Sequence, residues 1–138
     1  MNLKKILIVE DSELLHRMYN LIFLRHKSNG LQLISALNGR EGLSKLQEHA
    51  DTDLILLDIN MPEMSGLEFL HQIKKEKSLQ NIPVIIVSTE GSEEDTLRGL
   101  EAGATAYIKK PFQPSNIIKM VSRIAEMKHE HAGLNVVH

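Results

Sequence analysis

Short, uninterrupted runs of aliphatic residues constrain the fold of this chain more than any other feature of its sequence. A surface helix needs apolar residues every three or four positions, and a half-exposed strand needs them at alternate positions. Here they are consecutive over residues 6–9, 54–57 and 84–87, and more weakly over residues 106–108. Such runs predict strands covered on both faces, which is typical of parallel sheets. Residues 31–37 alternate more and predict an edge strand.

Segments with a helical period separate these runs. The first two predicted helices lie on either side of residues 31–37. Ser65 and Ser92 are each followed three residues later by an acid, a capping signature that predicts the start of a third and a fourth helix. Gly103 predicts the end of the fourth helix, and Pro114 the first turn of the fifth. Five strands alternating with five helices predict an α/β fold, an open doubly wound (βα)5 three-layer sandwich around a parallel sheet.

The length and composition indicate one soluble globular domain of 138 residues, with 42% hydrophobic and 25% charged residues. The absence of cysteine excludes disulfides, thiolate metal sites and cysteine nucleophiles. A formal net charge of -2 gives no electrostatic case for a nucleic-acid or membrane partner. No signal peptide or membrane span is evident, and we expect a cytoplasmic protein. We assign residues 1–126 to the domain and residues 127–138 to a mobile tail without an output domain.

Polar residues whose side chains could bind a ligand or react follow the predicted strands. Glu10 and Asp11 follow the first strand, Asp58 the third, Ser88 the fourth and Lys110 the fifth. Because the carboxyl ends of parallel strands meet at one edge, these groups should share one site. Crowded carboxylates repel unless a cation is present, and Mg²⁺ is the hard cation that oxygen ligands suit. A lysine beside such a metal indicates the handling of a phosphoryl group.

A bland alternative exists for each of these residues taken alone. A single aspartate at the end of a strand is usually a turn former or a helix cap, and acids before Ser12 are favourable at a helix start. The coincidence of acids at two strand ends with a hydroxyl and a lysine at two others favours a functional site. Four histidines on predicted helices do not follow strands in this way and are predicted to be partly exposed: His16, His26, His49 and His71.

The sequence resembles the receiver domain of bacterial two-component response regulators, in particular the stand-alone, CheY-like chemotaxis receivers. The matching motifs are ILIVEDS, LILLDINMPEMSG, PVIIVST and YIKKPF, at residues 6–12, 54–66, 83–89 and 107–112. Together they extend the resemblance over roughly residues 4 to 125. It implies a flavodoxin-like sheet with the strand order 2-1-3-4-5.

The resemblance also implies a role for each acidic residue. Asp58 would be the phosphoacceptor, taking a phosphoryl group from a phosphohistidine on a sensor kinase or a phosphotransfer protein. Asp11, Asp58 and the backbone carbonyl of Asn60 would ligate Mg²⁺ (or Mn²⁺), and Glu10 would act mainly through a bound water.

Further roles concern the phosphoryl group and the switch that responds to it. Lys110 would pair with the phosphoryl oxygens, Ser88 would donate its hydroxyl to one of them, and Tyr107 would change rotamer as Ser88 moves. The Lys110–Pro111 peptide bond would be cis. Asn60, Thr89 and Glu90 would tune the lifetime of the phosphoryl group, with the bulk of Thr89 slowing its loss.

The function that follows is a signalling switch rather than an enzyme. It would act on a downstream protein through its fourth helix, fifth strand and fifth helix, as in chemotaxis or a phosphorelay, as a monomer or as a weak dimer on phosphorylation. A flavin carrier of the same topology is disfavoured, because Glu10 and Asp11 would repel a flavin phosphate. A metal-dependent phosphohydrolase is disfavoured because Asn60 replaces the second acid that such enzymes need, and no nucleotide-binding P-loop is present.

Overall fold

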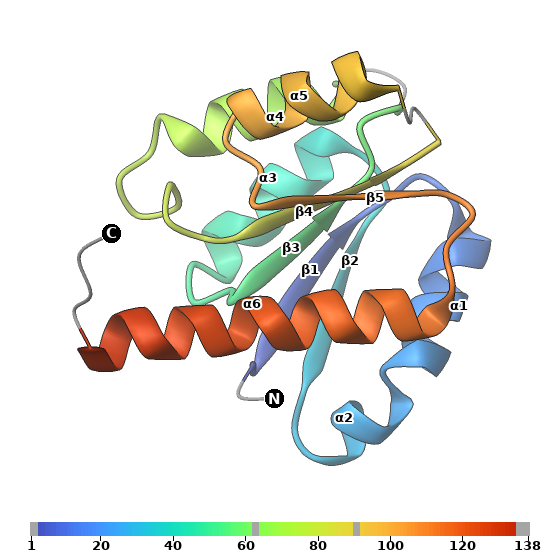
Figure 1. Cartoon of the computed structure of the whole chain (residues 1–138), viewed down its shortest axis with the longest axis vertical. Helices are drawn as coiled ribbons and strands as arrows, with labels where there is room; N and C mark the ends of the chain where they lie inside the picture. The colour runs from blue at the N-terminus through green and yellow to red at the C-terminus, as the bar shows by residue number, and fades with distance from the viewer. Residues whose placement is uncertain (1–2, 62–63, 90–91, 135–138) are drawn as a thin grey trace.

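The structure is a computed structural model that describes residues 3–61, 64–89 and 92–134, with the backbone alone for residues 128–134. A five-stranded sheet forms its centre (Figure 1), with the strand order β2-β1-β3-β4-β5. Every neighbouring pair of strands is parallel, and each predicted apolar run lies within or overlaps a strand. The predicted fold class and strand order are therefore confirmed. The strands are β1 (Lys5–Val9), β2 (Gln32–Ala36), β3 (Leu54–Leu57), β4 (Val84–Ser88) and β5 (Ala106–Lys109).

Helices cover both faces of the sheet. One face is covered by α1 and α6, and the other by α3, α4 and α5 (Figure 1). Parallel strands are joined by crossover helices, and these helices shield both faces of the sheet from water. The helices are α1 (Glu13–Ile22), α2 (Leu24–Ser28), α3 (Gly39–Glu48), α4 (Gly66–Lys74), α5 (Glu93–Glu101) and α6 (Pro114–Leu134).

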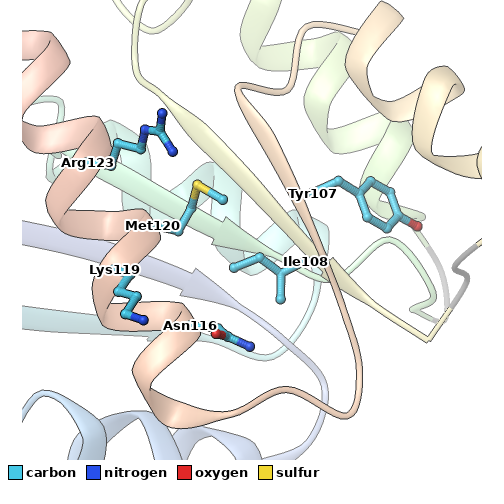
Figure 2. Close-up of a pocket in the computed structure, with 6 residues that line it drawn as sticks. All are labelled: Tyr107, Ile108, Asn116, Lys119, Met120 and Arg123. Carbon is cyan, nitrogen blue, oxygen red and sulfur yellow. The ribbon is translucent and has the colours of Figure 1, made fainter.

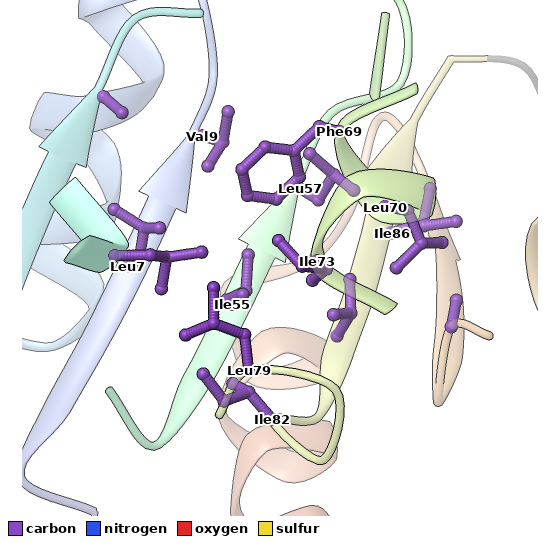
Figure 3. Close-up of a cluster of buried hydrophobic side chains, with 14 of the residues drawn as sticks. Leu7, Val9, Ile55, Leu57, Phe69, Leu70, Ile73, Leu79, Ile82 and Ile86 are labelled. Atoms are coloured by element: carbon purple, nitrogen blue, oxygen red, sulfur yellow. The ribbon is translucent and has the colours of Figure 1, made fainter. Parts of the chain in front are cut away.

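Alternate residues of each central strand enter opposite cores, because successive strand side chains point to opposite faces. On the α4 side, Phe69 and Ile73 pack against Ile55 and Leu57 (Figure 3). On the α6 side, the intervening strand residues, such as Leu56, meet an independent cluster from α1 and α6. β1, β3 and β4 are thus held from both faces.

The predicted helix starts are confirmed at both serines. The Ser65 hydroxyl accepts a hydrogen bond from the Glu68 amide at 3.2 Å, and the Ser92 hydroxyl accepts one from the Asp95 amide at 3.0 Å. Gly103 follows α5 with a φ of +111°, a conformation that favours glycine at a helix C-terminus.

The helices differ from the prediction in two places. The first predicted helix is α1, and a short helix that was not predicted, α2, follows it after the fully buried Phe23, where the backbone leaves helical geometry. The last helix was predicted to end near residue 126, and its backbone continues to Leu134. Residues 127–134 lack an apolar period, so the sequence pattern carries no signal for this extension.

The exposure predicted for His16 was wrong. His16 is 7% exposed and shares the inner face of α1 with Tyr19. The apolar residues Leu14 and Leu21 lie on the outer face, where 67% and 71% of each side chain is exposed. A helix with apolar residues on two faces can be turned either way, and packing of the large Tyr19 ring decides the outcome here. Within the described residues, no helix combines the length and apolarity needed to cross a membrane.

The buried leucine that precedes Asp58 should contribute strongly to the stability of the fold. Leu57 has no exposed surface, whereas Leu21 is 71% exposed, so the two residues form a matched pair for the same substitution. We expect Leu57→Ala to lower the free energy of unfolding by about 2–5 kcal/mol, because it leaves a cavity between packed layers. We expect Leu21→Ala to change it by less than about 0.5 kcal/mol. Urea titrations followed by circular dichroism would measure both, and equal effects would contradict the assigned core.

Candidate functional site

Three carboxylates meet at the carboxyl edge of the sheet. Glu10 and Asp58 directly follow β1 and β3, and these strands pair with Val9 opposite Leu57. The Asp58 amide also donates to the Val9 carbonyl at 2.9 Å, which fixes where the acid leaves the sheet. Glu10 and Asp58 are 2% and 5% exposed, whereas Asp11 is open to solvent. The three residues offer carboxylate oxygens within 4.8 Å of one another.

Lys110, which directly follows the edge strand β5, brings a positive charge to these carboxylates. Its Nζ donates to Glu10 Oε1 at 2.7 Å and lies 3.7 Å from Asp58 Oδ2. The Lys110 amide donates to the Ser88 carbonyl at 2.8 Å, so the pairing of β4 with β5 continues past the end of β5. The Lys110–Pro111 peptide bond is cis, as the resemblance implied.

Backbone amides fix the two buried carboxylates further. The Asn60 amide donates to Asp58 Oδ1 at 3.2 Å, and the Ser12 amide donates to Glu10 Oε2 at 3.1 Å. A buried charge is tolerated only when its oxygens have such partners. The loops after β1 and β3 therefore present oriented carboxylates rather than flexible ones.

Burial, rather than pairing, controls the protonation of these acids. Loss of hydration raises the pKa of the Glu10 carboxyl from 4.5 to about 7; the nearby Lys110 opposes this change, and Asp11 and Asp58 reinforce it. Burial also raises the pKa of Asp58, against the opposing effects of the Asn60 amide and Lys110. Lys110 therefore offsets only part of the effect of burial on these two carboxyls.

This donor set fits a hard divalent cation. Three carboxylates supply only oxygen ligands, which suit Mg²⁺ and Mn²⁺, and the exposed Asp11 leaves one side open to water. Burial raises the pKa of Glu10 and of Asp58 because it disfavours their ionised forms, and a bound cation would stabilise those forms. Glu10, Asp11 and Asp58 are the residues that would hold it.

The remaining predicted residues surround this cluster at different depths. Ser88, the last residue of β4, is fully buried, and Thr89 after it is exposed. Asn60 is exposed beside Asp58, while Glu90 lies outside the described residues. Tyr107 is half-buried on β5, and α5 approaches its ring so closely that a Cβ on Gly99 would lie 3.3 Å from Tyr107 Cδ2.

Sequence reasoning missed a glycine that lets α4 approach the site. A Cβ on Gly66 would lie 2.5 Å from the Asp58 carbonyl oxygen and would overlap the Ile59 Cα. Both are backbone atoms, so a larger residue would displace the segment that carries Asp58. The signal in the sequence was a glycine at the first position of a helix, directly after a capping serine.

Sequence reasoning also missed an aromatic contact that joins α1 to the segment after Lys110. Tyr19 stacks on Phe112 with ring centroids 5.9 Å apart and an interplanar angle of 17°. Tyr19 is 1% exposed, and burial raises the pKa of its hydroxyl, with smaller contributions from Glu10 and Asp58. The contact links the helix that follows Glu10 to the loop that holds Lys110.

This fold and this edge of acids and lysine define the response regulator receiver domain, and the model of that family matches residues 6–122. The chain belongs to this family, whose members act as phosphoacceptor signalling switches. It is 34% identical over 110 residues to chemotaxis protein CheY1 of Helicobacter pylori, covering 80% of this chain and 87% of that protein. It is 36% identical over 121 residues to the phosphate regulon transcriptional regulatory protein PhoB of Escherichia coli, covering 88% of this chain but 51% of PhoB. The chain thus spans about half the length of PhoB.

Solved structures agree with this family. The chemotaxis protein CheY4 of Vibrio cholerae, crystallised at low pH, superposes with a TM-score of 0.78 and 33% identity over 88% of this chain and 98% of that one. A CheY-like receiver domain protein from Methanospirillum hungatei gives a TM-score of 0.82 with 29% identity, over 94% of this chain and 99% of that chain.

The raised pKa of Glu10 predicts how stability depends on pH when metal is absent. Between pH 4.5 and about 7 the folded protein retains a proton that the unfolded chain has released, so this group's contribution to stability falls as pH rises. We expect it to lower the free energy of unfolding by an amount on the order of 2 kcal/mol between pH 5 and 8. The Glu10→Gln side chain cannot ionise, so the variant should not show this decrease in the free energy of unfolding between pH 5 and 8.

Thermal unfolding in EDTA across this pH range would measure the effect. The melting temperature of Glu10→Gln should rise relative to wild type as pH increases. A difference between the two proteins that stays constant with pH would contradict the assigned protonation.

Proposed function

We propose that Asp58 accepts a phosphoryl group from a phosphohistidine of a sensor histidine kinase or a phosphotransfer protein. The observation that carries this proposal is the geometry around Asp58: a buried carboxylate with two acids and a lysine beside it. An Asp58 oxygen attacks phosphorus, the P–N bond breaks, and its electron pair returns to the imidazole nitrogen of the donor. The product is an acyl phosphate on Asp58. When bound, Mg²⁺ would neutralise charge on the transferring phosphoryl group.

The residues of the chain position the reactants and respond to the product. The Asn60 amide, 3.2 Å from Asp58 Oδ1, orients the carboxylate. Lys110 Nζ, 3.7 Å from Asp58 Oδ2, lies within reach of a phosphoryl oxygen on that residue. Phosphorylation adds a charge of about -1.5 to -2 and three acceptor oxygens. Lys110 then gains a stronger partner than Glu10, and the buried Ser88 hydroxyl gains an acceptor.

We propose that the output surface comprises α5, β5 and α6, on the side of Lys110. A pocket of about 300 Å³ lies between β5 and α6, where Ile108 and Met120 provide apolar surface and Lys119 and Arg123 provide positive charge (Figure 2). Tyr107 is also among the residues that line this pocket, but its ring points away from α6. A downstream protein with apolar and acidic groups would complement this surface.

Apolar side chains are also exposed on α5. Leu97 and Leu100 are 58% and 40% exposed, and a Cβ on Gly99 between them would lie 3.3 Å from Tyr107 Cδ2. A change in the Tyr107 rotamer would therefore alter the surface that a partner meets. This supports signal output through protein contact rather than through catalysis.

Phosphorylation at Asp58 is directly testable with a small donor. We expect incubation with Mg²⁺ and acetyl phosphate to add one phosphoryl group, detected by intact-mass spectrometry. Asp58→Asn should abolish the adduct, and EDTA should prevent it. Asp51→Asn is the matched control, because Asp51 is exposed and pairs with Lys5 away from the site. An adduct that persists in Asp58→Asn would refute the assignment.

The exposed Thr89 should limit the loss of the phosphoryl group. Thr89 directly follows the buried Ser88 at the carboxyl edge of the sheet and is exposed to solvent. We expect Thr89→Ala to raise the dephosphorylation rate by a few-fold, on the order of 1 kcal/mol in the barrier. The decay of the mass adduct after removal of donor measures this rate. Thr105→Ala, also exposed but at the opposite end of β5, should leave the rate unchanged.

A further inference from the structure

A histidine on the inner face of α1 contacts the loop that carries two of the acids. His16 is 7% exposed, and its Nε2 lies 2.7 Å from the backbone carbonyl oxygen of Glu10. A carbonyl can only accept a hydrogen bond, so Nε2 carries the hydrogen and donates it. The ring's other nitrogen, Nδ1, is buried and has no hydrogen-bond partner among the described residues. The contact to Glu10 is thus the polar interaction that this buried ring makes.

The position of this hydrogen bond has a specific geometric consequence. The Glu10 carbonyl belongs to the peptide unit that joins Glu10 to Asp11, and that unit is planar. Fixing the direction of the carbonyl therefore fixes the plane from which the Asp11 Cα departs. His16 lies six residues further along the chain, so it ties the loop to the body of α1.

The other polar atoms of Glu10 are held by different parts of the fold. Its amide donates to the Ala36 carbonyl of β2 at 3.0 Å, and its carboxylate accepts from Ser12 and Lys110. Of these contacts, only the one from His16 acts on the peptide plane shared with Asp11. His16 thus contacts the backbone between Glu10 and Asp11 and forms no described hydrogen bond with either carboxylate.

We propose that His16 is a positioning residue for the divalent-cation site, acting through the Glu10–Asp11 peptide plane. The proposal rests on the function proposed above, in which Glu10 and Asp11 help to hold Mg²⁺. The partners that orient metal ligands typically contribute 10- to 100-fold to metal affinity. A role in packing alone would change the stability of the fold and leave the metal affinity of the folded protein unaltered.

Two substitutions separate these roles. His16→Leu keeps a buried side chain but removes the donor, and we expect it to weaken Mg²⁺ binding by about tenfold. His16→Gln can place an amide N–H near the position of Nε2, and we expect an affinity close to that of wild type. Mg²⁺ titrations followed by NMR of backbone amides measure binding in the folded protein without reference to phosphorylation.

His26→Leu is the matched control. Nδ1 of His26 is also buried without a described partner, but its ring packs on Phe23, at a centroid distance of 6.2 Å, rather than on the acidic loop. We expect this variant to lose stability and keep wild-type Mg²⁺ affinity. Equal weakening in His26→Leu and His16→Leu would overturn the proposal, because it would indicate a general effect of loosened packing.

The ring tautomer of the wild-type protein provides a test that does not depend on the folding of any variant. Nitrogen shifts of the His16 ring should show hydrogen on Nε2, and hydrogen on Nδ1 alone would overturn the proposal. Wild type that binds no Mg²⁺ would refute both the cation site and this role of His16. Wild type that binds Mg²⁺ while His16→Leu binds it equally well would refute the role of His16 alone.

Discussion

The repulsion between buried carboxylates is the constraint on which the site depends. Glu10 and Asp58 stand side by side because β1 and β3 are paired in register, and the hydrophobic layers above and below deny them water. Lys110 contacts Glu10 at 2.7 Å and Asp58 at 3.7 Å, so one positive charge is divided unequally between two acids. The three acids carry more negative charge than Lys110 offsets, and an added cation would stabilise their ionised forms.

The sheet supplies the rigidity that such an arrangement needs. Acids that repel one another would move apart on flexible loops, but here they follow strands whose side chains are buried on both faces. Backbone amides in the loops that follow these strands donate hydrogen bonds to Asp58 and Glu10 and so orient the two carboxylates. Stability and function are therefore opposed at this edge, because the same burial that orders the acids also penalises their charge.

Much of this structure could be predicted from sequence because it rests on strong local signals. Consecutive aliphatic residues identified the strands, and the residues after them identified Asp58, Glu10 and Lys110 as neighbours. The inward face of α1 could not be predicted, since its leucines compete with Tyr19 for the core and only tertiary packing resolves the competition. The close approach of Gly66 to Asp58 depends on how two segments cross in space, which no periodicity encodes. The burial of His16 escaped notice for the same reason as the orientation of its helix.

Because the strands are buried to different extents, β3 and β4 should resist displacement more than β5 does. β3 and β4 are buried along their whole length, whereas β5 lies at the edge of the sheet and no described residue in it is fully buried. Asp58 follows the fully buried strand β3, whereas Lys110 follows the partly exposed edge strand β5. A force between these two residues would therefore displace mainly β5, since sparsely buried elements move at the lowest cost in free energy. In the proposed switch, a change at Asp58 would therefore be transmitted mainly through β5, because the core holds this strand least firmly.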